Sequence, residues 1–153
     1  MTQALDAKTL EARMRQVFEE IVPFNRVLGL KIESVDPEAP KIRFDMRPDL
    51  VGNPLRQILH GGVISAVLDV TAGLAIQLAL LKQGSERSDG GVKFPNIGTI
   101  DLHVDYLRPG RGAYFIATGR VVRLGNRIAV AHMELANDTG DLIATGGAAY
   151  VVG

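Results

Sequence analysis

Residues 53–81 read NPLRQILHGGVISAVLDVTAGLAIQLALL and decide the fold, because the rest of the chain must pack around so apolar a run. The run opens with His60, Gly61 and Gly62 and carries one carboxylate, Asp69, near its middle. A helix that is apolar nearly all round is typical of the interior of a protein. A carboxylate placed there is costly to desolvate unless another group pairs with it or uses it. The fold therefore has to explain why a carboxylate, Asp69, lies within this apolar run.

The run predicts a buried helix of a water-soluble protein and not a membrane span. Between Val63 and Leu81 it contains four polar side chains, and a charged side chain is expensive at the centre of a bilayer: Ser65, Asp69, Thr71 and Gln77. Its small and polar residues also follow i, i+3 and i+4 spacing and so share one helical face: Gly62, Ser65, Asp69 and Gly73. One long helix wrapped by a strongly curved antiparallel sheet would satisfy this pattern.

The flanking sequence supplies such a sheet. Residues 7–21 have helical apolar spacing, and Pro23 is expected to end this amphipathic helix. Residues 28–35 and 41–47 alternate as two strands do, and a polar loop is expected at 84–91. Four further alternating stretches follow, at 98–107, 113–122, 127–136 and 142–152. Their short, turn-rich connections predict consecutive antiparallel hairpins.

Composition excludes several classes of protein. The chain has 153 residues, 17 basic and 17 acidic, so no overall charge would recruit nucleic acid or an anionic membrane. It contains no cysteine, which excludes disulfides, thiolate metal sites and a cysteine nucleophile. The N-terminus lacks the order of a secretory signal peptide, so a cytoplasmic location is the default expectation.

Three segments together resemble the hotdog-fold acyl-CoA thioesterases, and within them the PaaI-type group. They are HGGVISAVLD at 60–69, VGNPL at 51–55 and GTIDLHVDYLRPGRG at 98–112. The resemblance implies an α+β hotdog domain at 28–153, with residues 1–27 as a helical extension. It also implies a homodimer, stacked further into a dimer of dimers.

The glycine pair at the predicted helix start suits a thioester carbonyl. The first amides of a helix have no partner within the helix and lie at the positive end of its dipole. Without a Cβ at Gly61 or Gly62, a carbonyl oxygen could approach these amides and have its developing charge stabilised. The resemblance assigns this role to the Gly61 amide. The alternative is a glycine-rich helix start that merely allows tight packing.

Asp69 lies too far along the helix to act at its own Gly61. Eight residues span about 12 Å of helix, and a side chain that leans toward the N-terminus recovers only part of that distance. A second copy with its helix antiparallel would close the gap, giving a two-fold dimer with two shared sites. Gly62, Ser65 and Gly73 would let the helices approach. The alternative is a structural aspartate bonded to Ser65 or Thr71.

The resemblance implies roles for the residues around Asp69. Asp69 would be either the nucleophile or the general base for water, and the sequence leaves both open. Asn53 matches an asparagine that orients the water or the carbonyl. His60 either contacts the thioester or braces the loop and caps the helix. Thr99 falls where relatives place a hydroxyl near the attacking water, although an ordinary strand threonine would look the same.

No metal or cofactor is expected beyond the coenzyme A carried by the substrate. His103 and His132 have no second ligand at metal spacing and are interpreted as solvent-side or dimer-edge residues. Coenzyme A needs basic groups and open amides, and the candidates lie at the helix start and in two turns: Gly62, Tyr106, Arg108, Arg123, Gly125 and Asn126. Arg111, Arg127 and Lys93 are further candidates.

The sequence favours a hydrolase over three other readings. A non-catalytic acyl-CoA-binding module would have the same fold but release no thiol. A hotdog hydratase would pair a histidine with a carboxylate, and His60 is a poor match for that role. A purely structural dimer would leave Asp69 unexplained.

Overall fold

The computed structural model describes residues 6–84 and 95–153 of the chain. The helical segments are α1 (Ala7–Arg15), the π-helical η1 (Gln16–Ile21), α2 (Pro23–Leu28), the 3₁₀ turn η2 (Pro48–Leu50) and α3 (Gly61–Lys82). The strands are β1 (Lys31–Ser34), β2 (Lys41–Asp45), β3 (Val51–Asn53), β4 (Ile58–Leu59), β5 (Ile97–Tyr106), β6 (Tyr114–Leu124), β7 (Ile128–Asn137) and β8 (Leu142–Val152). Apart from Gly84, the polar loop expected at 84–91 lies outside the described residues, and so does Lys93.

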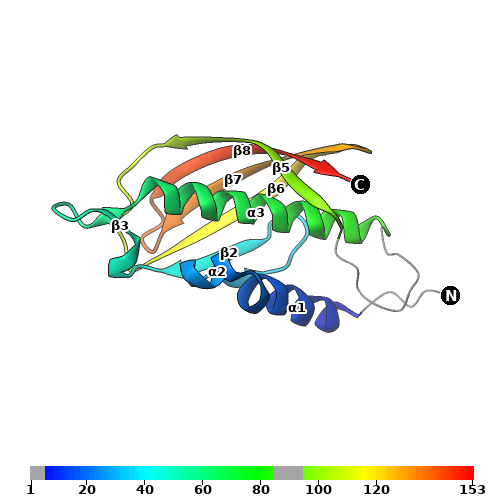
Figure 1. Cartoon of the computed structure of the whole chain (residues 1–153), viewed down its shortest axis with the longest axis horizontal. Coiled ribbons are helices and arrows are strands. Elements are labelled where there is room, and N and C mark those ends of the chain that lie inside the picture. The colour runs from blue at the N-terminus through cyan, green and yellow to red at the C-terminus, as the bar shows by residue number, and fades with distance from the viewer. Residues whose placement is uncertain (1–5, 85–94) are drawn as a thin grey trace.

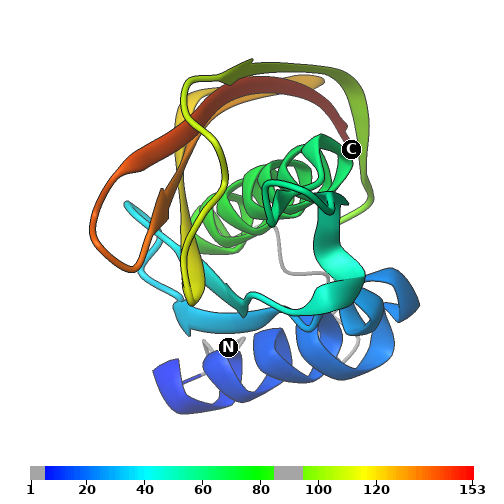
Figure 2. The same cartoon turned by 90° about the vertical axis from the view of Figure 1, so that its left-hand side faces the viewer.

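One curved antiparallel sheet wraps the long helix α3. The sheet has six strands in the order β1-β2-β6-β7-β8-β5, while β3 and β4 form a separate two-stranded ladder. Figure 1 shows α3 lying along the sheet. Figure 2 looks nearly along α3 and shows the sheet curving around it, with α1 and α2 beyond β2. The predicted α+β hotdog architecture is confirmed.

The expectation of consecutive hairpins is wrong at its first step. β6, β7 and β8 do pair in succession, but β5 pairs with β8, and β6 pairs with β2. The connection after β5 crosses the end of the sheet and packs under the β3–β4 ladder, where the Leu59 amide donates to the Gly110 carbonyl at 3.0 Å. A Cβ at Gly110 would lie 2.8 Å from the Leu59 Cβ, so this crossing requires glycine. β5 therefore becomes an edge strand of the sheet.

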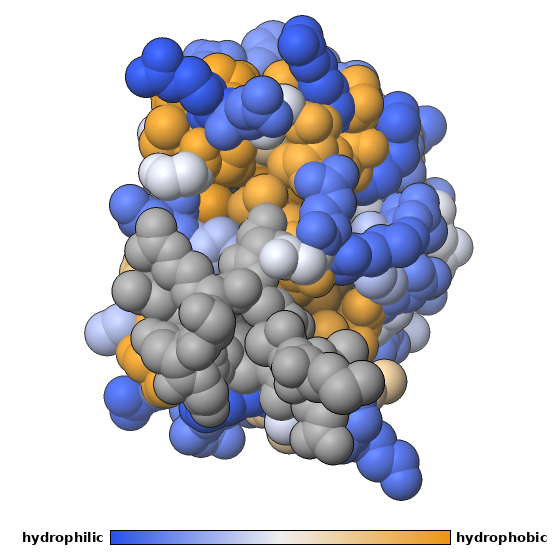
Figure 3. All heavy atoms as spheres, turned by 90° about the vertical axis from the view of Figure 1, so that its right-hand side faces the viewer, coloured by the Kyte–Doolittle hydropathy of each residue, from blue (hydrophilic) through white to orange (hydrophobic). Residues whose placement is uncertain are grey.

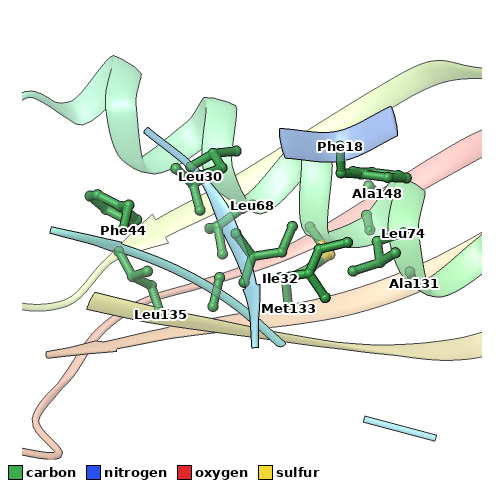
Figure 4. Packing of buried hydrophobic residues seen from close by; sticks show 14 of the residues in the cluster. Phe18, Leu30, Ile32, Phe44, Leu68, Leu74, Ala131, Met133, Leu135 and Ala148 are labelled. Carbon is green, nitrogen blue, oxygen red and sulfur yellow. The ribbon is translucent and has the colours of Figure 1, made fainter. Parts of the chain in front are cut away.

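The core lies between α3 and the concave face of the sheet. Eleven residues of α3 are buried, and 61% of its most apolar 18-residue window lies inside the protein, although its length and hydropathy would suit a membrane span. Strands β6 and β7 alternate buried and more exposed positions, as half-buried strands do. Figure 4 shows the resulting cluster, which includes Phe18, Ile32, Leu68, Leu74, Met133 and Leu135. The predicted burial of α3 is confirmed.

The N-terminal helix is present and ends before Pro23 as predicted, since η1 stops at Ile21 and Val22 has an extended backbone. Pro23 then begins a second short helix, α2, where its fixed φ suits the first position and its missing amide hydrogen costs nothing. This second helix ends at its C-cap Gly29, which has φ +70°. Met14 and Phe18 belong to the same buried cluster as α3. The division into residues 1–27 and 28–153 stays a prediction.

The sequence did not predict the β3–β4 ladder that precedes α3. It packs directly on the start of the helix, since a Cβ at Gly52 would lie 2.5 Å from the His60 Cα. Glycine at position 52 therefore lets the ladder hold the start of α3, called the helix tip below, in place.

At the opposite end of the molecule, Figure 3 shows apolar surface among hydrophilic side chains.

Candidate active site

The start of α3 is fixed by His60. This residue is the N-cap, with an extended backbone, and its Nδ1 accepts a hydrogen bond of 2.8 Å from the Gly62 amide. A neutral imidazole that accepts at Nδ1 carries its hydrogen at Nε2. The structure therefore places His60 in the capping role that the sequence left as one of two alternatives.

The neighbouring amide of Gly61 is left open. In residues 6–84 and 95–153, no oxygen accepts a hydrogen bond from the Gly61 N–H. The Gly61 carbonyl is occupied, because the Tyr106 hydroxyl donates to it at 2.8 Å. A first-turn amide without a partner is what a developing oxyanion needs. Of the two glycines, Gly61 is thus the one whose donor is available.

Asp69 is held by two hydroxyl groups from the sheet. Its carboxylate is partly buried, and its Oδ1 accepts hydrogen bonds from the Thr99 hydroxyl at 2.9 Å and the Tyr150 hydroxyl at 2.5 Å. The expected structural partners are wrong, because Ser65 donates to the Gly62 carbonyl and Thr71 to the Val67 carbonyl. The carboxylate is therefore anchored across the core and not within its own helix.

Thr99 reaches Asp69 because β5 contains a bulge. The register of β5 against β8 shifts between Thr99 and Asp101, so Ile100 is an extra residue on β5. Without it, strict alternation would point Thr99 and Tyr106 to opposite faces of the sheet, since seven residues separate them. With it, both contact α3, Thr99 through Asp69 and Tyr106 through Gly61.

In one chain the structure does not bring Gly61 and Asp69 together. They are two turns apart, or about 12 Å along the axis of α3. The two also contact opposite ends of β5, where Tyr106 and Thr99 lie. Gly73 is not available to a partner helix, contrary to expectation, because it is buried beside Tyr150 and Ile97 of its own chain.

A pocket of about 350 Å³ opens beside the helix tip. Gly61, Tyr106 and two arginines, Arg56 and Arg108, are among the residues that line it. Arg108 Nη1 donates to the Leu142 carbonyl at 2.8 Å, which holds its guanidinium near the sheet. The pocket therefore combines an open amide with positive charge, a combination that suits an anionic ligand.

Asn53 shapes the turn that carries Arg56. Its Oδ1 accepts hydrogen bonds from the Leu55 and Arg56 amides, both at 3.1 Å. In one chain it thus braces the β3–β4 turn and makes no hydrogen bond to Asp69 or to the Gly61 amide. Its expected role toward water or the carbonyl stays a prediction.

Three of the expected coenzyme contacts lie far from the helix tip of the same chain. Arg123 is near the end of β6, and Gly125 and Asn126 form the turn into β7, where the Gly125 amide donates to the Ile128 carbonyl at 3.0 Å. This turn lies at the opposite end of the sheet from Arg108. Within one chain, this turn and Arg108 are therefore separated by the length of the sheet.

The two remaining histidines are exposed on the outer face of the sheet, as expected for solvent-side residues. His103 contacts Asp105 at 3.1 Å, and His132 contacts Arg120 at 3.3 Å. They line a larger hollow of about 530 Å³ that includes neither Gly61 nor Asp69. Within the described residues, no three His, Cys, Asp or Glu side chains gather as metal ligands.

Comparison with known proteins decides the family. The model of the "Thioesterase superfamily" matches residues 56–144. Over its full length the chain is 41% identical to the whole of "Medium/long-chain acyl-CoA thioesterase YigI" from Escherichia coli strain K12. The chain belongs to the thioesterase superfamily. The thioesterase-superfamily match spans the helix tip, Asp69 and Thr99 but stops before Tyr150.

Two solved structures have the same fold as this chain. A crystal structure from Shewanella oneidensis, described as related to the thioesterase superfamily, is 43% identical with a TM-score of 0.85, over 95% of this chain and 97% of that one. The BH2602 protein from Bacillus halodurans, whose crystal structure was determined with CoA, is 28% identical with a TM-score of 0.60, over 73% of this chain and 66% of that one. These relatives support the assignment of the sheet and of α3 to one thioesterase-superfamily domain.

Two residues of the candidate site were not predicted from the sequence, Arg56 and Tyr150. Arg56 lies between His60 and the VGNPL segment that carries the resemblance, so its position near the start of α3 could have been predicted from the sequence. Tyr150 could not be predicted in this way, since it lies 81 residues after Asp69 and reaches it only through the order of the strands.

Substitutions of His60 distinguish its two expected roles, which are capping the helix and contacting the thioester. We expect His60→Ala to lower stability by about 1 kcal/mol, through loss of the cap, and the melting temperature by roughly 2–4 °C. His60→Ser restores an N-cap acceptor and should recover the melting temperature, measured by circular dichroism. Wild-type turnover in His60→Ser identifies the residue as a cap alone, whereas lost turnover at full stability would show that the imidazole contacts the thioester.

Proposed function

We propose that this chain is an acyl-CoA thioesterase that hydrolyses acyl-CoA to a free acid and coenzyme A. The observation that carries the proposal is the open Gly61 amide on the same helix as a carboxylate held by two hydroxyls. The similarity to the Escherichia coli medium/long-chain acyl-CoA thioesterase YigI supports medium- and long-chain acyl groups as the substrates. Membership in the PaaI-type group and a cytoplasmic location belong to the same proposal.

The proposed site is shared between two copies related by a two-fold axis. The thioester oxygen binds the Gly61 amide of one copy, and Asp69 of the other copy acts on the carbonyl carbon. The separation of Gly61 from Asp69 within one chain, by about 12 Å, supports this arrangement. So does the outer edge of β5, which pairs with no other strand among the described residues and can offer its backbone groups beside Thr99 to a second copy. A further dimer of dimers is compatible with this arrangement.

The chemistry needs only groups that the chain supplies. In the general-base route, Asp69 takes a proton from water, hydroxide adds to the carbonyl, and the C–S bond breaks to release coenzyme A, which takes up the proton. In the nucleophilic route, an Asp69 oxygen adds to the carbonyl and the C–S bond breaks to release coenzyme A as a thiolate. Water then cleaves the acyl–aspartate anhydride to the free acid and the Asp69 carboxylate, and the thiolate takes up a proton from that water. In both routes the Gly61 amide stabilises the oxyanion. We propose no metal and no cofactor besides the coenzyme A of the substrate.

The coenzyme is proposed to lie in the pocket at the helix tip. Arg56 and Arg108 supply positive charge for its phosphates, and Tyr106 lines the path to Gly61. Arg123, Gly125 and Asn126 would come from the second copy, because they lie at the opposite end of their own chain. The CoA in the Bacillus halodurans structure supports a coenzyme site in this fold.

Release of free thiol from a panel of acyl-CoAs tests the proposal. The panel runs from short to long acyl chains and includes aryl-CoA, with a thiol reagent as the readout. We expect turnover that is highest for medium and long chains. Binding of acyl-CoA in calorimetry without release of thiol from any member would instead establish the non-catalytic binding module.

A further inference from the structure

Tyr150 joins Asp69 to the last strand of the sheet. The phenol is 4% exposed and lies on the inner face of β8. Its oxygen is 2.5 Å from both the Asp69 backbone carbonyl and the Asp69 Oδ1. One hydroxyl thus contacts the backbone and the side chain of the same residue, which fixes the carboxylate relative to the axis of α3.

The hydrogen bonds at Asp69 divide its two oxygens unequally. Oδ1 accepts from Thr99 and from Tyr150, whose single hydroxyl hydrogen it shares with the Asp69 backbone carbonyl. Oδ2 accepts no hydrogen bond from any of the described residues. The carboxylate therefore has one oxygen held by hydroxyls of the sheet and one oxygen without a hydrogen-bond partner among the described residues.

We propose that Tyr150 is a positioning residue that holds Asp69 by Oδ1, so that Oδ2 is the oxygen that attacks the thioester or activates water. This inference rests on the proposed thioesterase function and adds to it the identity of the reacting atom. Tyr150 lies outside the segment matched by the family model, so family membership does not supply it.

The surroundings keep the phenol a donor. Burial, and then the hydrogen bond to Asp69, raise the pKa of Tyr150 well above its usual value, so the hydroxyl keeps its hydrogen at any working pH. Gly73, one turn after Asp69, leaves the phenol oxygen room beside the helix, since even a Cβ there would lie 3.6 Å away. The Tyr150 hydroxyl therefore remains a hydrogen-bond donor and lies close to Asp69.

Tyr150→Phe removes the hydroxyl and keeps the ring in the core. We expect kcat to fall about 10- to 100-fold, as for the loss of a hydrogen bond to a charged group, while KM stays within about twofold. Tyr114→Phe is the matched control, because it removes a phenol hydroxyl that has no contact with Asp69 among the described residues; it should retain wild-type kcat.

A double-mutant cycle distinguishes positioning from general support of the fold. If Tyr150 acts through Asp69, Tyr150→Phe costs nothing further in an Asp69→Asn background, whereas a structural role would lower the residual rate again. Wild-type kcat in Tyr150→Phe overturns the inference and leaves the proposed function intact. A wild-type protein that releases no thiol overturns both.

A second measurement does not depend on the folding of Tyr150→Phe. The chain has three tyrosines and no tryptophan, so absorbance at 295 nm reports phenol ionisation without interference. Asp69→Asn should let one tyrosine ionise at lower pH than in the wild type, with far-UV circular dichroism confirming that both remain folded. Identical titrations of the two proteins would contradict the contact on which the inference depends.

Discussion

Asp69→Asn lowers kcat for acyl-CoA hydrolysis by about 10²–10⁴-fold, the usual cost of removing a general base. Asparagine keeps the shape of the side chain and can still accept from Thr99 and Tyr150, but it can neither take a proton from water nor attack a carbonyl. Affinity for coenzyme A should be retained, because the pocket at the helix tip is untouched. Thiol release gives kcat, and calorimetry gives the affinity.

Asp105→Asn is the matched control for this variant. Asp105 is an aspartate on β5, exposed on the outer face of the sheet, where it contacts His103. It should keep wild-type turnover. Equal turnover of Asp69→Asn and the wild type would remove Asp69 from the mechanism.

Two inactive variants should restore activity when they are mixed. Gly61→Pro removes the open amide but suits the first helical position, and the extended backbone of His60 is the conformation that a following proline favours. We expect Gly61→Pro alone to lose about 10²–10³-fold in kcat, as other lost oxyanion donors do. Gly61→Ala keeps the amide, and its Cβ would meet Tyr106 only at ordinary contact distance, 3.4 Å, so it should stay active.

The mixture tests the shared site directly. In a mixed dimer of Gly61→Pro and Asp69→Asn, one of the two sites combines an intact Gly61 with an intact Asp69. Statistical mixing makes half of the dimers mixed, so co-refolded protein should regain about one quarter of wild-type activity. A mixture that stays as inactive as its components would place both groups of the site in one chain.

Local pattern predicted those parts of the fold that depend on neighbouring residues. The buried helix follows from the apolar run of 61–82, and the succession of β6, β7 and β8 follows from short turns. The place of β5 could not be predicted in this way. The turn that follows β5 has the composition of a hairpin turn. The chain instead crosses the end of the sheet because Gly110 packs against Leu59, a contact that composition does not reveal.

In the candidate site, too, the sequence predicts only those features that depend on neighbouring residues. Gly61 and Asp69 could be singled out because a helix fixes their separation. His60 remained ambiguous, because capping depends on a ring nitrogen reaching one amide, which spacing cannot reveal. Tyr150 could not be found, since its contact with Asp69 joins residues 81 positions apart.

The bulge at Ile100 decides whether Thr99 and Tyr106 face the same side of the sheet. Thr99 serves the carboxylate and Tyr106 serves the glycine tip, and both face α3 only because β5 holds one residue more than its partner strand between them. A gain or loss of a single residue in this interval would turn one of the two side chains away from α3. The number of residues between 99 and 106 is therefore as constrained as the identity of the two side chains. The connection beyond Tyr106 can change in length without changing which way these side chains face.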